Sequence, residues 1–273
     1  MILFEICGCV PTEGTQTHSK TNSSQKTEAR FLCVGMEYSQ RFGACPGCEL
    51  DAKRLSALLG SHYAYQGKTL ISGEATKARV VSELKKGVES TPENGLFLFM
   101  YSGHGGSERL GGSEPDGATP EDEFLCLYDN YMLDDEIWEI VSKCRGRVFM
   151  YFDACHSETM YRSVSVPIVK DIGSAMSVNM VRTKGFMFRP RASAMSGGNS
   201  VRMMCWSGCR EFEFSYGSRA GGVMTNVLMD RWGFKKTYGS LWNDVLRGVG
   251  ENRPDQHPVC TVMGGGFEGE VFR

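Results

Sequence analysis

Short apolar runs alternate with segments of helical spacing along most of the chain. Residues 96–101 (LFLFMY) and 148–152 (VFMYF) are apolar at every position, which predicts strands buried on both faces. Further strands are predicted at residues 31–35, 69–72, 201–206 and 259–263, and helices at 50–59, 76–90, 134–144, 221–232 and 241–249. This alternation predicts an α/β fold, a mostly parallel central sheet with helices on both faces.

Changes of composition divide the chain into four parts. Residues 1–29 are predicted to form a flexible N-terminal arm, because from residue 11 they are polar and show no apolar period. Residues 30–157 and residues 201–273 carry the alternating pattern and are predicted to form a large and a small segment of one domain. Between them, residues 158–200 are rich in Ser, Met, Arg and Lys, which is typical of a long connection.

Charge and cysteine content limit the cellular compartment and the binding partners that the sequence leads us to expect. The net charge of -2 gives no reason to expect binding to nucleic acid or to an anionic membrane. No run of about 18 apolar residues is present, and the apolar start MILFEICGCV lacks a basic flank, so neither a membrane span nor a signal peptide is expected. The 11 cysteines are scattered and odd in number, which favours free thiols in a reducing compartment, the cytoplasm.

Two chemically reactive residues follow the two most apolar runs. His104 lies in a glycine-rich turn predicted after residues 96–101, and Cys155 lies just past residues 148–152. The carboxyl ends of neighbouring parallel strands meet at one edge of a sheet, so an imidazole could draw the proton from a thiol there. The amides of Gly105 and Cys155 could then hold an oxyanion. Each residue alone also fits a structural role, a buried thiol or a histidine in a turn.

The two motifs together resemble those of the metacaspases, in the caspase-like clan of cysteine peptidases. The resemblance rests on YSGHGG (101–106) and, about fifty residues later, DACHS (153–157), the separation typical of caspases. It continues more loosely through DDEIWEIV, WSGC, GGVMTNVLM and QHPVC, and covers roughly residues 30–273. It implies a caspase-like fold without a large prodomain, and cleavage of protein or peptide substrates after Arg or Lys. It also implies a monomer, because extra strands cover the edge by which caspases dimerise.

The resemblance also implies an acidic substrate pocket. The family's pocket maps onto Cys48, Asp51, Ser102 and Asp153. Two carboxylates in one pocket would pair with a basic side chain, whereas a pocket for Asp would need arginines, and none flank these motifs. Asp51 alone could equally be a capping or solvated carboxylate.

Calcium is the cofactor that the resemblance implies, as an activator outside the chemistry. The family's calcium-binding aspartates map onto Asp122, Asp134 and Asp135, and hard oxygen ligands suit Ca²⁺. Acids at the start of a helix are also common without any metal. A further aspartate of the family falls at Arg162, and Glu158 replaces the usual glycine after the CHS motif. These departures support the alternative of a catalytically weak, caspase-like regulatory or binding protein.

Two other features could carry chemistry. Cys45 and Cys48 form a CxxC, which could be a redox couple or half of a zinc site, although no second CxxC follows. The connection at 158–200 contains basic residues that offer self-cleavage sites: Arg162, Lys170, Arg182, Lys184 and Arg189.

Overall fold

The computed structural model describes residues 28–40, 42–63, 65–108, 122–156, 181–185, 201–210 and 213–273. The strands are β1 (Ala29–Gly35), β2 (Gln66–Ile71), β3 (Leu96–Glu108), β4 (Asp122–Cys126), β5 (Tyr131–Leu133), β6 (Arg147–His156), β7 (Val181–Gly185), β8 (Arg202–Ser207), β9 (Phe214–Ser218), β10 (Gly221–Gly222) and β11 (Val259–Met263). The helices are α1 (Cys48–Tyr63), α2 (Lys77–Ser90), α3 (Asp134–Val141), α4 (Val223–Arg231) and α5 (Tyr238–Asn252). None of these helices is long and apolar enough to cross a membrane.

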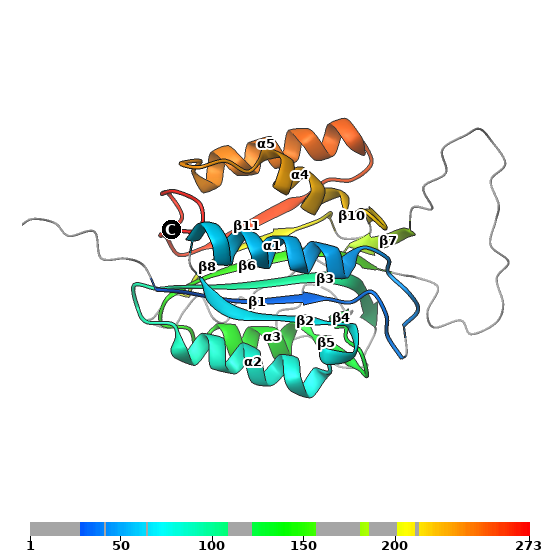
Figure 1. The fold of residues 1–273 in the computed structure, drawn as a ribbon, viewed down its shortest axis with the longest axis horizontal. Coiled ribbons are helices and arrows are strands. Elements are labelled where there is room, and N and C mark those ends of the chain that lie inside the picture. The colour runs from blue at the N-terminus through cyan, green and yellow to red at the C-terminus, as the bar shows by residue number, and fades with distance from the viewer. Residues whose placement is uncertain are drawn as a thin grey trace, which may run out of the picture.

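A central parallel sheet organises the fold. Strands β2, β1, β3, β6 and β8 are neighbours and all parallel, and β11 joins β8 in the antiparallel direction. Helices α1, α4 and α5 cover one face of this sheet and α2 and α3 the other (Figure 1). The predicted α/β architecture is therefore confirmed.

Both faces of the central strands are buried, as their continuous apolar runs predict. Along β3, Leu96, Leu98 and Met100 pack in the core with α1, α4 and α5, and the alternate residues Phe97 and Phe99 pack in the core with α2 and α3. All are 0% exposed. The alternation follows from the period of two along a strand.

The predicted ends of the two key strands are wrong. The strand β3 does not stop before Gly103 but runs on to Glu108, and β6 runs on through Cys155 to His156. The glycine-rich stretch stays extended because it pairs with β6 on one side and, from Gly105 onward, with β4 on the other. These backbone hydrogen bonds outweigh the low strand propensity of glycine.

The prediction of a monomer depends on which strands lie at the edges of the sheet. β11 pairs with β8 alone, and no described strand lies beyond it. Whether extra strands cover the edge by which caspases dimerise therefore stays a prediction. The extra strands β7, β9 and β10 instead extend the sheet beside the carboxyl end of β6. The oligomeric state stays a prediction.

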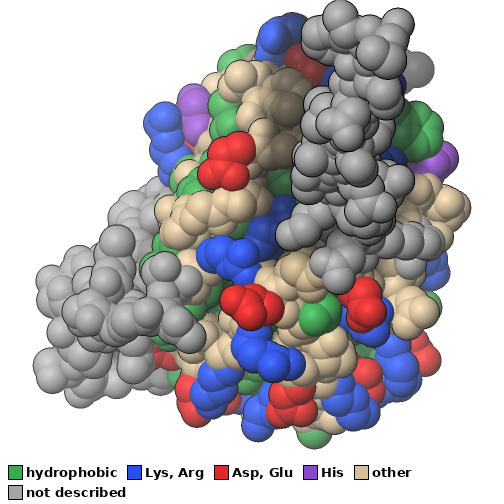
Figure 2. All heavy atoms as spheres, turned by 90° about the vertical axis from the view of Figure 1, so that its left-hand side faces the viewer, with side chains coloured by type: hydrophobic (Ala, Val, Ile, Leu, Met, Phe, Trp, Pro, Cys, Tyr) green, Lys and Arg blue, Asp and Glu red, His purple; other side chains and the backbone are tan. Residues whose placement is uncertain are grey.

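The face where β1 begins carries charges of both signs. Figure 2 shows Lys and Arg side chains interleaved with Asp and Glu over this face, rather than gathered into one basic patch. Beside the start of β1, Lys68 and Lys86 form ion pairs with Glu83. This mixture agrees with the small net charge.

Candidate active site

His104 and Cys155 occupy opposite positions on neighbouring strands. In the parallel β3–β6 ladder, His104 is the register partner of Cys155, and Ser102 is the partner of Asp153. Neighbouring strands lie about 4.8 Å apart. The predicted convergence of the two motifs is therefore found in the backbone. Cys155 is described by its backbone alone, so the geometry of the site is built from the side chains around it.

The imidazole of His104 is held by one ring nitrogen, while the other has no hydrogen-bond partner among the described residues. Its Nε2 lies 3.2 Å from the carbonyl oxygen of Ala44. Since a carbonyl only accepts, Nε2 carries the hydrogen, and Nδ1 of the neutral ring is left as a proton acceptor. Nδ1 is buried and has no hydrogen-bond partner among the described atoms.

Burial also favours the neutral form of this histidine. The side chain is 7% exposed. Burial lowers the pKa of His104, and the hydrogen bond to Ala44 opposes this only in part. A neutral imidazole with a bare nitrogen suits the role of a general base. The contact with the Ala44 carbonyl fixes the orientation of the ring, and it was not predicted because a backbone oxygen leaves no mark in the sequence.

The four residues predicted to line an acidic pocket lie close together in the structure. Asp51, Ser102, Asp153 and Cys48 are all buried, and Ser102 Oγ donates to Asp51 Oδ2 over 2.8 Å. Asp51 lies in the first turn of α1, so three elements, α1, β3 and β6, contribute to the cluster.

The small segment supplies further contacts that were not predicted. The backbone amide of Gly222 donates to Asp51 Oδ2 over 2.9 Å. The backbone amide and hydroxyl of Thr225 donate to Asp153 Oδ2 over 2.8 and 2.7 Å, and Ser215 donates to Asp153 Oδ1. Small residues in short strands and at a helix start are common, so the sequence offered no signal for these contacts.

Burying the carboxylates of Asp51 and Asp153 close to each other is electrostatically unfavourable. Burial, and next the charge of Asp153, raise the pKa of Asp51, and burial raises the pKa of Asp153. Asp51 Oδ1 is buried and has no hydrogen-bond partner among the described residues. Two buried carboxylates with a free acceptor oxygen would be stabilised by a cation brought between them.

Glycines of the small segment lie directly against both carboxylates. A Cβ at Gly221 would lie 2.2 Å from Asp51 Oδ1, and one at Gly222 would lie 2.1 Å from Asp153 Oδ2. Gly221 also has φ +106°, a conformation that disfavours other residues. The β10 backbone can approach the acidic cluster only because both side chains are absent.

The CxxC turn borders the same cluster. The sulfurs of Cys45 and Cys48 lie 3.0 Å apart as free thiols, and both side chains are buried. A hydrogen bond with Cys45, together with burial, raises the pKa of Cys48, which makes this thiol a poor nucleophile. No group of three His, Cys, Asp or Glu side chains suited to a metal is found among the described residues, so the half zinc site gains no further ligand there.

The predicted calcium aspartates lie at one end of a hairpin. β4 and β5 pair so that Phe124 is opposite Leu133. Asp122 lies two residues before Phe124, and Asp134 and Asp135 directly follow Leu133 as the first residues of α3. The backbone therefore brings the three positions near one another, although the Asp122 side chain is outside the described atoms. Aspartates at these three positions would supply the oxygen ligands that suit a hard cation. Arg162 and Glu158 lie outside the described residues.

Similarity to known proteins agrees with these observations. Residues 29–163 match the family described as "Metacaspase, peptidase C14 domain". Metacaspase-1 of Ajellomyces capsulatus is 24% identical over 86% of this chain and 78% of its own length. Metacaspase-1A of Aspergillus niger is 27% identical over 64% of the chain, which spans 46% of that protein.

A solved structure extends the likeness to the whole fold. Caspase-1 from Spodoptera frugiperda superposes with a TM-score of 0.58 at 14% identity, over 87% of each chain. At so low a sequence identity the comparison shows only the fold, which is caspase-like. On the matched domain and these relatives, the chain belongs to the metacaspase family of cysteine-type peptidases.

Proposed function

We propose that the protein is a cysteine endopeptidase that cuts protein or peptide substrates after Arg or Lys, with Cys155 and His104 as a catalytic dyad. The observation that carries this proposal is the pairing of His104 with Cys155, two residues beyond the buried carboxylate of Asp153. A nucleophile, a base and a cation-binding cluster then lie at one end of one sheet.

The chemistry follows from the bare nitrogen of His104. Nδ1 accepts the thiol proton of Cys155, and the thiolate attacks the carbonyl carbon after the basic residue. The developing oxyanion would be held by the amides of Gly105 and Cys155. His104 then returns the proton to the leaving amine, and water releases the acyl group.

The preference for a basic residue follows from the acidic cluster. A guanidinium or ammonium group between Asp51 and Asp153 would offset their repulsion and engage the free Oδ1 of Asp51. The side chain of Asp in a substrate would add a third negative charge to the pocket. Protein substrates with Arg or Lys before the cut are therefore the expected partners.

Calcium is proposed as an activator, with Asp122, Asp134 and Asp135 as its ligands. When bound, the ion would neutralise the acids that crowd the start of α3 and hold that helix to β4. No step of peptide cleavage depends on it. The alternative of a catalytically weak regulatory protein is disfavoured by the costly carboxylate pair, which such a protein has no need to keep.

A panel of fluorogenic peptides with Arg, Lys, Asp or Ala before the cut tests this function. We expect turnover of the Arg and Lys peptides, its loss in Cys155→Ala, and retention in the control Cys260→Ser, which removes a partly exposed thiol from the edge strand β11. Equal turnover of all four peptides would contradict the proposed pocket. Equal turnover by Cys155→Ala would contradict the proposed nucleophile.

A further inference from the structure

The two carboxylates of the acidic pocket differ in their hydrogen bonds. Asp153 accepts three from described residues: two from the amide and hydroxyl of Thr225 on Oδ2, and one from the hydroxyl of Ser215 on Oδ1. Asp51 accepts its two on Oδ2, while its Oδ1 has no partner among the described residues. Of the two, Asp153 therefore has the surroundings that better stabilise a charged carboxylate.

A buried tyrosine donates to one of these donors. Tyr151 Oη lies 3.2 Å from Thr225 Oγ1, and both side chains are 0% exposed. A hydroxyl has a single hydrogen, and Thr225 gives its own to Asp153, so Tyr151 must be the donor in its bond with Thr225. A first hydrogen-bond relay thus runs from Tyr151 through Thr225 to Oδ2 of Asp153.

A buried glutamine donates to the other. Gln256 Nε2 lies 3.2 Å from Ser215 Oγ and 2.9 Å from the carbonyl oxygen of Gly208. Gln256 Oε1 accepts the backbone amide of Tyr216 over 3.1 Å. These two backbone partners fix which end of the Gln256 amide faces Ser215, because a carbonyl only accepts and an amide N–H only donates. A second relay thus runs from Gln256 through Ser215 to Oδ1 of Asp153.

We propose that Tyr151 and Gln256 are positioning residues that keep the Asp153 carboxylate charged, each through the hydroxyl that it supports, so that the pocket binds the cationic side chain of Arg or Lys. This inference rests on the proposed peptidase function and deepens it. It gives the two carboxylates different roles: Asp153 carries the lasting negative charge, and the open Oδ1 of Asp51 contacts the substrate.

The physical reason lies in the absence of water around the relays. Their four members are at most 1% exposed: Tyr151, Thr225, Ser215 and Gln256. Hydrogen bonds in such a chain polarise one another, so a hydroxyl that accepts a bond donates more strongly. Burial raises the pKa of Asp153, and the bonds from Thr225 and Ser215 oppose this. Weaker donors would let Asp153 take up a proton, which would leave less negative charge for the substrate's cation.

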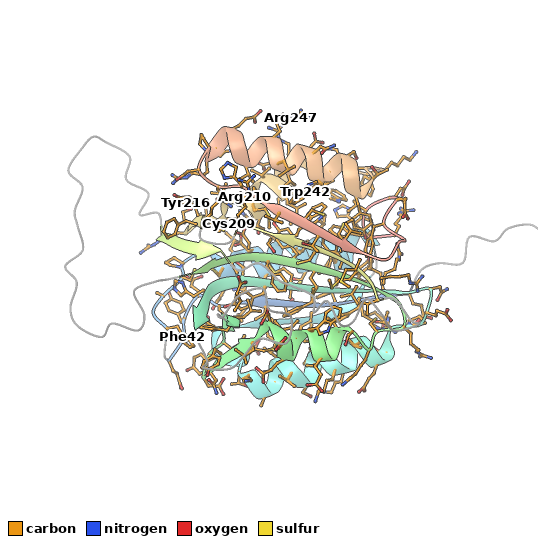
Figure 3. All side chains as sticks on the ribbon, turned by 180° about the vertical axis from the view of Figure 1, so that it is seen from behind. Phe42, Cys209, Arg210, Tyr216, Trp242 and Arg247 are labelled. Atoms are coloured by element: carbon orange, nitrogen blue, oxygen red, sulfur yellow. The ribbon has the colours of Figure 1, made fainter. Side chains whose placement is uncertain are left out.

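Both relays join the small segment to the large one. Asp153 lies on β6, whereas Thr225 lies in α4 and Ser215 on β9. Figure 3 shows Tyr216, the residue after Ser215, at the same end of the sheet as β7, which pairs with Cys155. The charge of the acidic pocket therefore depends on how the small segment packs against the large one.

The substitution Tyr151→Phe removes only the first donor of one relay. KM for an Arg peptide should rise roughly two- to tenfold with kcat unchanged, because the pocket holds the basic side chain equally before and during the reaction. Turnover of an Ala peptide should not change. Tyr65→Phe is the matched control, since it also removes a buried tyrosine hydroxyl, one that donates to the Phe272 carbonyl, and it should change neither constant. An unchanged KM in Tyr151→Phe, or an equal loss with the Ala peptide, would overturn the proposal.

Variants of Thr225 test whether the effect passes through its hydroxyl. Thr225→Val should raise KM for the Arg peptide by about tenfold or more, and Thr225→Ser, which keeps the hydroxyl, should restore it. In the Thr225→Val background, Tyr151→Phe should add no further loss, whereas Gln256→Met, which interrupts the other relay, should add one. A further loss from Tyr151→Phe in that background would show that Tyr151 does not act through Thr225 and would refute the relay.

Comparison of the wild type with Arg and Ala peptides separates this inference from the function on which it rests. If the wild type prefers the Arg peptide and Tyr151→Phe keeps the full preference, the relay is refuted while the peptidase stands. If the wild type turns over neither peptide, the proposed function fails and this inference fails with it.

Discussion

Replacing Asp51 by Asn separates the role of its charge from the role of its shape. In the wild type, Oδ2 of Asp51 accepts hydrogen bonds from Ser102 and Gly222, and an asparagine oxygen can accept both. The substitution Asp51→Asn therefore keeps these contacts but removes one of the two buried charges. It should weaken cleavage after Arg and at the same time stabilise the fold.

The size of the loss follows from the contact that Asp51 would make with the substrate. A hydrogen bond to a charged group contributes about 1.5 to 3 kcal/mol. At about 1.4 kcal/mol per factor of ten, kcat/KM for an Arg peptide should fall roughly 10- to 150-fold. A peptide with Ala before the cut makes no such contact, so its slow turnover should be unchanged.

The gain in stability follows from the direction of the pKa shift. Burial and Asp153 raise the folded-state pKa of Asp51 above its unfolded value of about 3.9. The folded state therefore binds the proton more tightly, and stability is lost as pH rises from that value through the folded-state pKa. Asn cannot ionise, so the variant should have the higher Tm at neutral pH.

Two measurements check this prediction, steady-state kinetics with Arg and Ala peptides and thermal unfolding at pH 7. Glu49→Gln is the matched control, since it removes a carboxylate from the same turn of α1 outside the pocket. Hydrogen bonds lower the pKa of Glu49 despite its partial burial, so this control should be slightly less stable and equally active. Unchanged kcat/KM for the Arg peptide in Asp51→Asn would refute the pocket, and a lower Tm would refute the electrostatic argument.

Three further predictions concern pH, packing and calcium. Because burial lowers the pKa of His104, peptide cleavage should persist below pH 6.5, the approximate ordinary value, and fall only at lower pH; an acid limb above that value would contradict the buried neutral base. Gly222→Ala should lower Tm and abolish cleavage, since its Cβ would meet Asp153 Oδ2 at 2.1 Å and overpacking costs about 1 to 3 kcal/mol, whereas Gly239→Ala, in open space on α5, should raise Tm slightly. Asp134→Asn should raise the calcium concentration for half-maximal cleavage, and identical wild-type rates in calcium and in a chelator would refute the calcium site.

Much of the fold could be predicted because its central strands are apolar on both faces. A strand such as residues 96–101 is apolar at every position, so its composition alone predicts that both of its faces are buried. The small strands β7, β9 and β10 are rich in Gly, Ser and charged residues and carry no such pattern. They are strands because their partners offer backbone groups to pair with, and pairing between distant segments is invisible in local sequence.

The site was predicted in part for a similar reason. His104 and Cys155 were predicted from side chains that the chemistry requires after buried strands, whereas Asp51 and Asp153 were assigned through the resemblance to the metacaspases. Groups that act through the backbone, such as the Ala44 carbonyl and the Gly222 amide, could be any residue type and left no signal. The extension of β3 through its glycines was missed because propensity favours a turn there.

Covalent labelling tests the convergence of His104 and Cys155 most directly. A peptide that ends in Arg and carries a thiol-reactive group is added to the wild type, and the modified residue is found by peptide mass spectrometry. We expect one adduct, on Cys155, with a rate that falls at least tenfold in His104→Ala. Labelling of another cysteine, or of Cys155 at an unchanged rate without the imidazole, would contradict the proposed dyad.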